Sequence, residues 1–180
     1  MASTTDRIER NITLKAPVSK VWQALTDYKK FGQWFLVNLE SPFVEGESTS
    51  GKITHPGYEH VTMSVKVHTI EPESLFSYYW HPYAVDPQMD YSAEPPTLVE
   101  FRLQAIDSGT LLTVCESGFD ALPAARRDEA FRMNDGGWAQ QLVNIQNFVE
   151  RVAGVRNERV GEPYCSKYET NHGRVLPYAL

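Results

Sequence analysis

The sequence predicts an α+β domain in which an antiparallel sheet is followed by one long helix. Segments that alternate apolar and polar residues come one after another through the middle of the chain, which predicts consecutive strands. Helical spacing of apolar residues occurs only outside this region, and helices segregated from a run of strands are typical of α+β proteins. The last such pattern is an apolar stripe that predicts a helix over residues 123–153.

One strand and two short helices are predicted to precede a meander of about six strands. The loose alternation over residues 8–14 predicts the strand. Pro17 then stands where a first helical turn tolerates proline, and apolar residues at helical spacing predict a helix over 17–26. A second helix is predicted at about 28–35, and it carries the aromatic residues Tyr28, Phe31, Trp34 and Phe35.

The clearest strand of the meander covers residues 60–70. Its odd-numbered positions from Val61 to Val67 are apolar and its even-numbered positions are polar, which predicts a half-buried antiparallel strand. Further strands are predicted at 52–55, 75–80, 99–104 and 112–117. The turn between the last two is the hairpin signal Asp107-Ser108-Gly109.

Two segments lack any periodicity. Residues 82–96 hold four prolines and predict a long loop, which in a compact domain is either a functional lid or a mobile segment. Gly154 is predicted to end the long helix, so the folded domain is assigned to residues 1–154 and an extended tail to 155–180. We expect this tail to pack over its own domain or onto a second copy, which favours a homodimer.

Composition excludes several classes of protein. The formal net charge is −6 and there is no run of Lys or Arg, so nucleic acid is not expected as a partner. No apolar stretch approaches ~18 residues, so no membrane span is predicted. The N-terminus is polar and lacks the apolar core of a signal peptide. With only Cys115 and Cys165, the chain fits a reducing cytoplasm, although a single disulfide remains compatible with the sequence.

Four groups of motifs follow one another in a fixed order across residues 8–150. They are Ala16-Pro17 with Val21-Trp22, Ala24-Leu25-Thr26-Asp27 and Trp34; Ile70-Glu71-Pro72 with Leu75 and Trp80; Gly109-Thr110-Leu111-Leu112-Thr113 with Ser117-Gly118-Phe119; and Gly137-Trp138 with Leu142. The ordered set resembles the START-like SRPBCC superfamily, and within it the branch homologous to the activator of the heat-shock protein 90 ATPase.

The resemblance implies a helix-grip fold, in which a curved antiparallel sheet of about six to seven strands surrounds a long C-terminal helix and an internal cavity. It does not fix an activity, because the superfamily includes lipid carriers, plant-hormone receptors, cyclases and co-chaperone domains.

Catalytic and metal-binding motifs are absent from the sequence. There is no GxSxG, HExxH or CxxC motif and no phosphate-binding glycine loop, so no cofactor is expected. The trio His55, Glu59 and His60 flanks a Pro-Gly turn, and exposed hairpin side chains are favoured there over a metal site. We likewise predict that the arginines near the start of the long helix, Arg126, Arg127 and Arg132, form a solvated face.

Glu116 is the most informative polar residue. The strand period of two places it on the same face as Leu112 and Val114, where a carboxylate in a cavity would be desolvated and its pKa raised. Two alternatives stay open: a bend at Ser117-Gly118 that turns the side chain outward, or an ion pair with Arg132. Cys115, on the opposite face, is expected to be a packed small residue.

These observations lead to a ligand-binding hypothesis. We predict non-catalytic binding of a small, mainly apolar ligand in a cavity between the sheet and the C-terminal helix. The alternatives are a co-chaperone-like protein–protein module that stimulates a chaperone ATPase, and a cyclase- or hydratase-type enzyme with Glu116 as acid or base. The predicted ligand-binding residues are Trp34, Tyr78, Trp80, Phe101, Glu116, Phe131, Trp138 and Leu142. Trp80, Phe101, Trp138 and Leu142 are expected to line the cavity itself.

Overall fold

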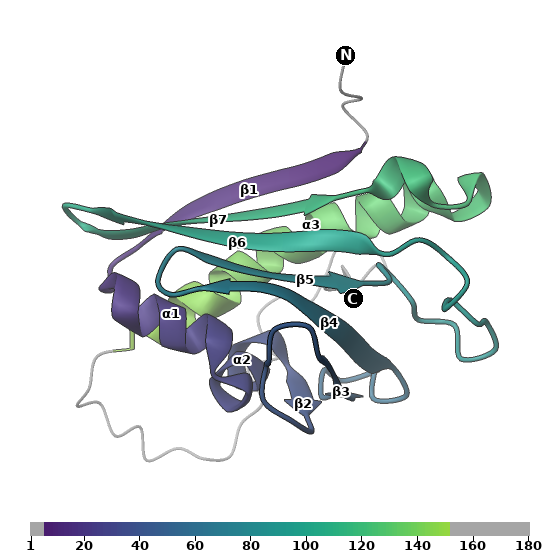
Figure 1. Ribbon diagram of the computed structural model, residues 1–180, viewed down its shortest axis with the longest axis horizontal. Helices are drawn as coiled ribbons and strands as arrows, with labels where there is room; N and C mark the ends of the chain where they lie inside the picture. The colour runs from purple at the N-terminus through teal and green to yellow at the C-terminus, as the bar shows by residue number, and fades with distance from the viewer. Residues whose placement is uncertain (1–5, 152–180) are drawn as a thin grey trace, which may run out of the picture.

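The computed structural model describes residues 6–151 and shows a seven-stranded sheet that curves around a long helix (Figure 1). The elements are, in chain order, β1 (Arg7–Leu14), α1 (Val18–Thr26), α2 (Tyr28–Phe35), β2 (Val37–Leu39), β3 (Ser48–Ile53), β4 (Thr62–Glu71), β5 (Leu75–Trp80), β6 (Thr97–Ile106), β7 (Gly109–Ser117), the 3-10 helix η1 (Phe119–Ala121) and α3 (Ala124–Val149). The strand order is β1-β7-β6-β5-β4-β3-β2, and each neighbouring pair is antiparallel. The predicted fold class is confirmed.

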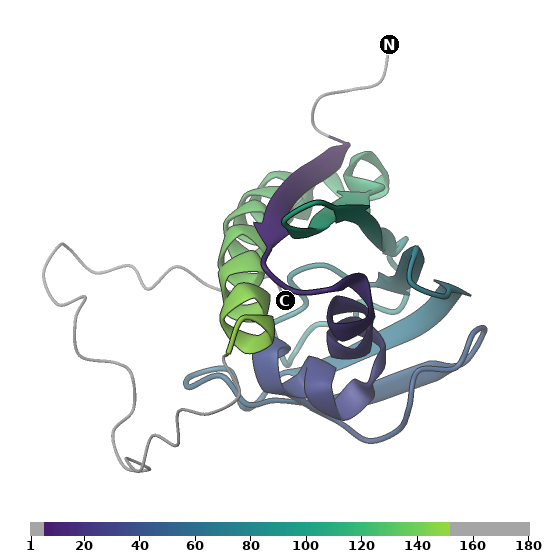
Figure 2. The ribbon, with the colours of Figure 1, turned by 90° about the vertical axis from the view of Figure 1, so that its left-hand side faces the viewer.

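The two short helices connect the two edge strands of the sheet. β1 and β2 lie at opposite edges, and the chain passes from one edge to the other through α1 and α2. Turned by 90°, the structure shows α3 lying across one face of the curved sheet with α1 and α2 beside it (Figure 2). Since α3 contacts α1, α2 and β1, the three helices together close the concave side of the sheet.

Asp27 separates the two short helices. It ends α1, and its side chain accepts hydrogen bonds from the backbone N–H groups of Lys29 and Lys30 at 2.9 and 3.1 Å. A side chain that accepts from the first free N–H groups of a helix is an N-cap, so one residue both stops α1 and starts α2. The indole of Trp34 donates to Ala24 O at 2.8 Å and fastens α2 back onto α1.

The structure differs from the sequence prediction at β2 and β3. β2 has only three residues, too few to show an alternating pattern, and no strand was predicted there. β3 begins at Ser48, inside a Gly/Ser-rich stretch that looks like a break in the sequence. The glycine in this stretch has a packing reason: a Cβ at Gly51 would lie 2.1 Å from Asn38 O of the neighbouring strand. Glycine within a strand therefore marks a close backbone approach.

The C-terminal boundary falls partly outside the described residues. α3 ends at Val149, four residues before the predicted end, and it runs without interruption through Gly136 and Gly137. The predicted tail 155–180 and Cys165 lie outside residues 6–151. Within those residues, no helix is long and apolar enough to cross a membrane.

Replacing glycine by alanine is expected to have opposite effects on the free energy of unfolding at Gly109 and at Gly136. Gly109, in the hairpin between β6 and β7, has φ of +142°, and a Cβ there would lie 2.1 Å from Leu14 O. Gly109→Ala should therefore lower the free energy of unfolding by about 2–4 kcal/mol, measured by urea denaturation. Gly136→Ala adds a methyl group where nothing lies within 4 Å and should raise it by about 0.5–1 kcal/mol, because alanine favours a helix interior. Equal effects at the two positions would contradict this interpretation.

Candidate functional site

Glu116 points into the interior of the domain. It lies on β7 between Ile8 of β1 and Val99 of β6, and its side chain shares the inner face with Leu112 and Val114. The residue is 0% exposed. The strand period therefore predicted its direction correctly, and the outward-turning bend is wrong.

The carboxylate of Glu116 accepts hydrogen bonds from four side chains. Oε1 accepts from Trp80 Nε1 at 2.7 Å and from Thr97 Oγ1 at 2.7 Å. Oε2 accepts from Trp138 Nε1 at 2.7 Å, and Asn134 Nδ2 lies 3.0 Å from Oε2 and 3.2 Å from Oε1. Since Trp80 ends β5, Thr97 begins β6 and the other two donors lie on α3, these bonds join three strands to the long helix. We call these five residues the Glu116 network.

No cation balances the charge of this carboxylate within the network. Arg132, the partner considered from the sequence, is exposed to solvent, so the proposed ion pair is wrong. Burial raises the pKa of Glu116 because it disfavours the charged form, while the hydrogen bonds from Thr97, Trp138, Trp80 and Asn134 oppose part of that rise.

The hydrogen-bonding capacity of Glu116 is used within the protein. An ionised carboxylate offers about four lone-pair sites, and four donors occupy them here. Among the buried polar atoms left without a hydrogen-bond partner in the described part of the chain are Tyr78 Oη and Asn134 Oδ1. Burial and the nearby Glu116 charge raise the pKa of Tyr78 well above 10.0.

Five of the predicted aromatic residues form one packed cluster, which includes the two tryptophans of the Glu116 network. Ring centroids are 5.8 Å apart for Trp80 and Trp138, 5.7 Å for Phe101 and Trp138, and 6.2 Å for Tyr78 and Phe101. Trp34 joins them through Phe101 at 6.4 Å. The sequence predicts that these side chains line a cavity between the sheet and α3. In the structure the rings pack against one another in that space.

The other two predicted apolar residues, Phe131 and Leu142, lie outside this aromatic cluster. Phe131 is only partly buried and packs on Phe119 at 5.1 Å, near the start of α3. Leu142 is buried in the core, 6% exposed.

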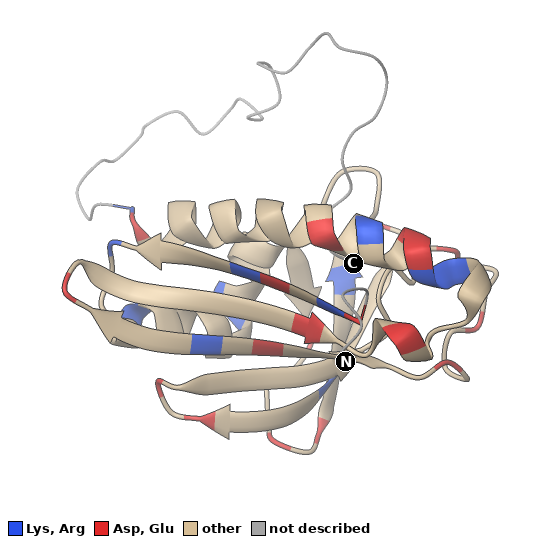
Figure 3. Ribbon diagram, turned by 90° about the horizontal axis from the view of Figure 1, so that it is seen from above, with Lys and Arg blue, Asp and Glu red and all other residues tan. Residues whose placement is uncertain are grey.

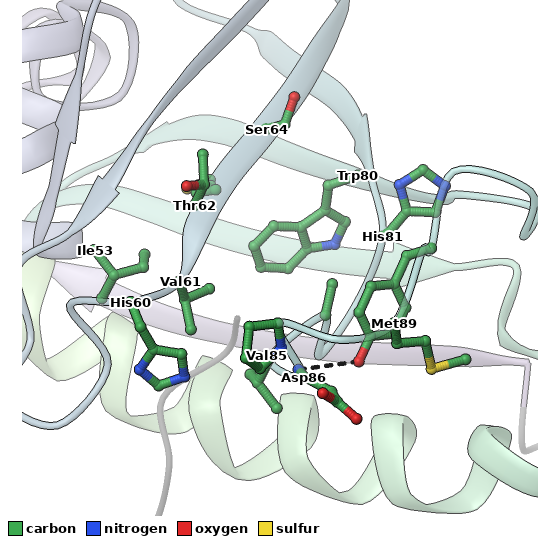
Figure 4. A pocket seen from close by; sticks show the side chains of 14 residues that line it. Ile53, His60, Val61, Thr62, Ser64, Trp80, His81, Val85, Asp86 and Met89 are labelled. Atoms are coloured by element: carbon green, nitrogen blue, oxygen red, sulfur yellow. Dashed lines mark hydrogen bonds between the residues drawn. The ribbon is translucent and has the colours of Figure 1, made fainter.

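A pocket of about 370 Å³ opens beside this cluster, at the end of β5 (Figure 4). Of the eight predicted residues, only Trp80 lines it. The lining residues are Ile53, His60, Val61, Thr62, Met63, Ser64, Trp80, His81, Ala84, Val85, Asp86, Pro87, Met89 and Tyr91. Nothing in the sequence pattern pointed to the β3 and β4 residues of this wall, because their spacing is that of ordinary strands.

The loop between β5 and β6 supplies much of the pocket wall, and an arginine of α3 anchors it. Arg126 is half-buried rather than solvated, and its guanidinium binds the Glu94 carboxylate with NH2 2.6 Å from Oε2. The prediction of a solvated arginine face is therefore wrong at this residue. Arg127 donates to Leu122 O at 3.0 Å, at the start of its own helix.

The remaining candidate groups do not form a site. His60 is exposed at the pocket rim, and within residues 6–151 no three His, Cys, Asp or Glu side chains converge in a way that would hold a metal ion. Cys115 is buried on the outer face of β7, and burial raises the pKa of its thiol. A raised pKa reduces the thiolate fraction, so this thiol is a weaker nucleophile at neutral pH than an ordinary cysteine.

A curved antiparallel sheet that surrounds one long C-terminal helix, with two short helices after the first strand, is the architecture of START-like helix-grip domains. The family model described as activator of Hsp90 ATPase homolog 1-like protein matches residues 15–150, and the chain belongs to this family. A search of curated proteins found no match.

Solved structures with this fold are similar to the chain at low sequence identity. Protein MLL2253 from Mesorhizobium loti is 20% identical with a TM-score of 0.65, and the match covers 82% of this chain and 98% of that one. The Aha1 dimer from Colwellia psychrerythraea, a solution structure, is 19% identical with a TM-score of 0.59, covering 80% and 96%. DynU16, from the dynemicin biosynthetic locus, is 23% identical with a TM-score of 0.62, covering 81% of this chain and 47% of that one. These likenesses show the fold alone.

The Glu116 network makes a prediction for stability. Glu116→Gln keeps the shape of the side chain but turns amide N–H groups toward donors, so about two hydrogen bonds to a charge are lost. We expect the free energy of unfolding at pH 7 to fall by about 2–4 kcal/mol, measured by urea denaturation. The control is Glu100→Gln, which removes a carboxylate paired with the exposed Arg102 and should change stability by less than about 0.5 kcal/mol.

The raised pKa of Glu116 gives this variant a pH signature. Since the pKa is higher in the folded state than its ordinary value of 4.5, the folded protein binds the proton more tightly than the unfolded chain does. The part of the stability that comes from this tighter proton binding is therefore fully present below pH 4.5 and is lost as pH rises through the folded pKa, while the part that comes from the hydrogen bonds remains at pH 7. The difference in unfolding free energy, wild type minus Glu116→Gln, should decrease as pH rises over this range. A difference that increases with pH would mean that the hydrogen bonds outweigh burial and lower the pKa.

Proposed function

We propose that the protein binds a small, mainly apolar ligand in the pocket beside Trp80. The observation that carries this proposal is the pocket itself, since about 370 Å³ lies within the range of small-molecule sites. Its wall is apolar at Trp80, Ile53, Val61, Met63 and Val85, and polar at His60, Thr62, Ser64, His81, Asp86 and Tyr91. An open pocket with both apolar and polar groups can hold the apolar part of a small molecule and orient it by its polar part.

Trp80 is the fixed wall of this proposed site. Its indole N–H donates to Glu116, so the ring is held in place and its polar edge is already bonded within the protein. A ring held in one orientation lowers the entropy cost of binding, because little side-chain freedom is lost when the ligand arrives. Glu116 thus supports the site from behind without contacting the ligand.

Binding is favoured over a reaction at Glu116. The carboxylate is fully buried and its lone pairs accept from protein donors, so a substrate would have to displace part of the Glu116 network to exchange a proton with it. General acid–base catalysis requires the side chain to come within hydrogen-bond reach of the reacting group. This supports a non-catalytic role for the site.

A variant that fills the pocket tests the proposal. Ala84→Phe places a ring in the pocket, whereas Ala93→Phe adds the same ring to an exposed position of the same loop. With Nile red as a neutral apolar probe, we expect the dissociation constant to rise at least about tenfold for Ala84→Phe, or about 1.4 kcal/mol, and to stay unchanged for Ala93→Phe. Mass spectrometry of organic extracts from the purified wild type should also show a bound small molecule that Ala84→Phe lacks. Equal dye binding by both variants would contradict the assignment of the pocket.

The second candidate function is a co-chaperone-like protein–protein module, and the family model over residues 15–150 favours it. Against it, the exposed large hydrophobic side chains among residues 6–151 are Val44, Met89 and Val143, on three separate elements. Docking surfaces are usually contiguous apolar patches. We therefore expect an Hsp90 ATPase rate, measured with and without this chain, to be unchanged. Stimulation that Ala84→Phe leaves intact would make the protein–protein function the better assignment.

Two further expectations remain proposals. The Colwellia psychrerythraea structure is described as a dimer, and we propose that this chain also forms a homodimer. We also keep the cytoplasm as the proposed location.

A further inference from the structure

One arginine holds both ends of the loop that walls the pocket. This β5–β6 loop covers residues 81–96 (Figure 1). At its start, Arg126 NH1 donates to Pro82 O at 2.9 Å and to Tyr83 O at 3.2 Å. At its end, Arg126 Nε and NH2 donate to the Glu94 carboxylate at 2.6–3.0 Å. The two ends are thus fastened to the same guanidinium.

The Arg126–Glu94 ion pair is shielded from water. The side chains are only 11% and 7% exposed, and the guanidinium carbon also lies 4.8 Å from the centre of the Tyr91 ring. The other ion pairs between described side chains are far more exposed, such as Arg10–Asp135 at 38% and 43%. Figure 3 shows the charged residues of α3 gathered in its first half, and Arg126 is the third residue of this helix. Removal of one partner would leave a buried charge without compensation, so this contact strongly favours one position of the loop.

Backbone strain is stored where the loop begins. Tyr83 has φ of +51°, in the left-handed region that a bulky residue rarely adopts, and its carbonyl is one of the groups that Arg126 holds. Such a conformation persists only when surrounding contacts impose it, and it is common at segments that switch between two positions.

The middle of the loop is bonded mainly to itself. Asp86 N donates to Tyr91 Oη at 3.1 Å, Gln88 N to Asp86 Oδ1 at 2.9 Å, and Ser92 N to Asp90 Oδ1 at 2.9 Å. It can therefore move as one unit. Its inner side lines the pocket through Ala84, Val85, Asp86, Pro87, Met89 and Tyr91.

We infer that the β5–β6 loop is a lid over the Trp80 pocket and that Arg126 is the latch that keeps it closed. The inference rests on the proposed function, because it concerns access to the same pocket. When Arg126 releases both Glu94 and the carbonyls of Pro82 and Tyr83, the two ends of the loop lose their shared anchor, although a 3.0 Å contact between His81 Nε2 and Glu94 O still joins them to each other. The strain at Tyr83 can then relax, so the lid moves away and the pocket opens. Arg126 is a positioning residue, which controls how fast a ligand enters and leaves.

The first measurement is hydrogen–deuterium exchange of the full chain without ligand. In Arg126→Gln and in Glu94→Gln, amides of residues 84–93 should exchange at least about tenfold faster than in the wild type, while those of β6 and β7 stay protected. Arg127→Gln is the matched control, since it removes a neighbouring cation that binds only Leu122 O among the described contacts. Unchanged exchange in both latch variants would overturn the latch.

The second measurement is stopped-flow binding of Nile red. A lid that must open before entry predicts that both the association and the dissociation rate constants rise about tenfold or more in the latch variants, whereas a damaged pocket raises only the dissociation rate constant. Faster dissociation without faster association would therefore overturn the lid. Failure of the wild type to bind the dye would overturn the proposed function instead, and the exchange experiment would still decide whether Arg126 fastens the loop.

Discussion

The buried carboxylate of Glu116 and its four donors fasten the long helix to the middle of the sheet from inside the core. Trp80 ends β5, Thr97 begins β6, and Asn134 and Trp138 are one helical turn apart on α3. Apolar packing is non-directional, and it would tolerate a helix that rotates or slides along the sheet. Hydrogen bonds to one ionised group are directional, so they fix both the rotation and the axial position of α3.

That constraint also explains where the pocket lies. Both indole N–H groups reach the same carboxylate, which draws Trp80 and Trp138 together and closes the space between the sheet and α3. On its other side, Trp80 lines the pocket together with residues at the ends of β3 and β4 and of the β5–β6 loop, and none of the described lining residues belongs to a helix. The same tryptophan therefore separates a filled interior from an open pocket. The position of the pocket at the end of the sheet thus follows from the bonding of one buried acid.

The sequence predicted the features that depend on local periodicity. Alternation in residues 60–70 identified β4, and counting by two from Leu112 placed Glu116 on the inner face. Features that depend on partners distant in the chain were not predictable. Nothing near Glu116 shows that its donors come from positions 18 to 36 residues away, and nothing near Arg126 shows that its partner is Glu94. The aromatic residues were recognised as inward-facing, but whether they enclose a space or fill it depends on three-dimensional packing.

The pairing of β1 with β7 has a consequence for how the chain folds. Arg7 pairs with Ser117, so about a hundred residues separate β1 from its partner strand in the sequence. Contacts this distant in sequence are slow to form, because the entropy of closing the loop is lost before the contact is gained. During synthesis β1 emerges first and stays unpaired until β7 follows it, and Glu116 then stays short of two donors until α3 docks. The domain is thus expected to acquire its native interior late and in a single step, after the ribosome has released the long helix.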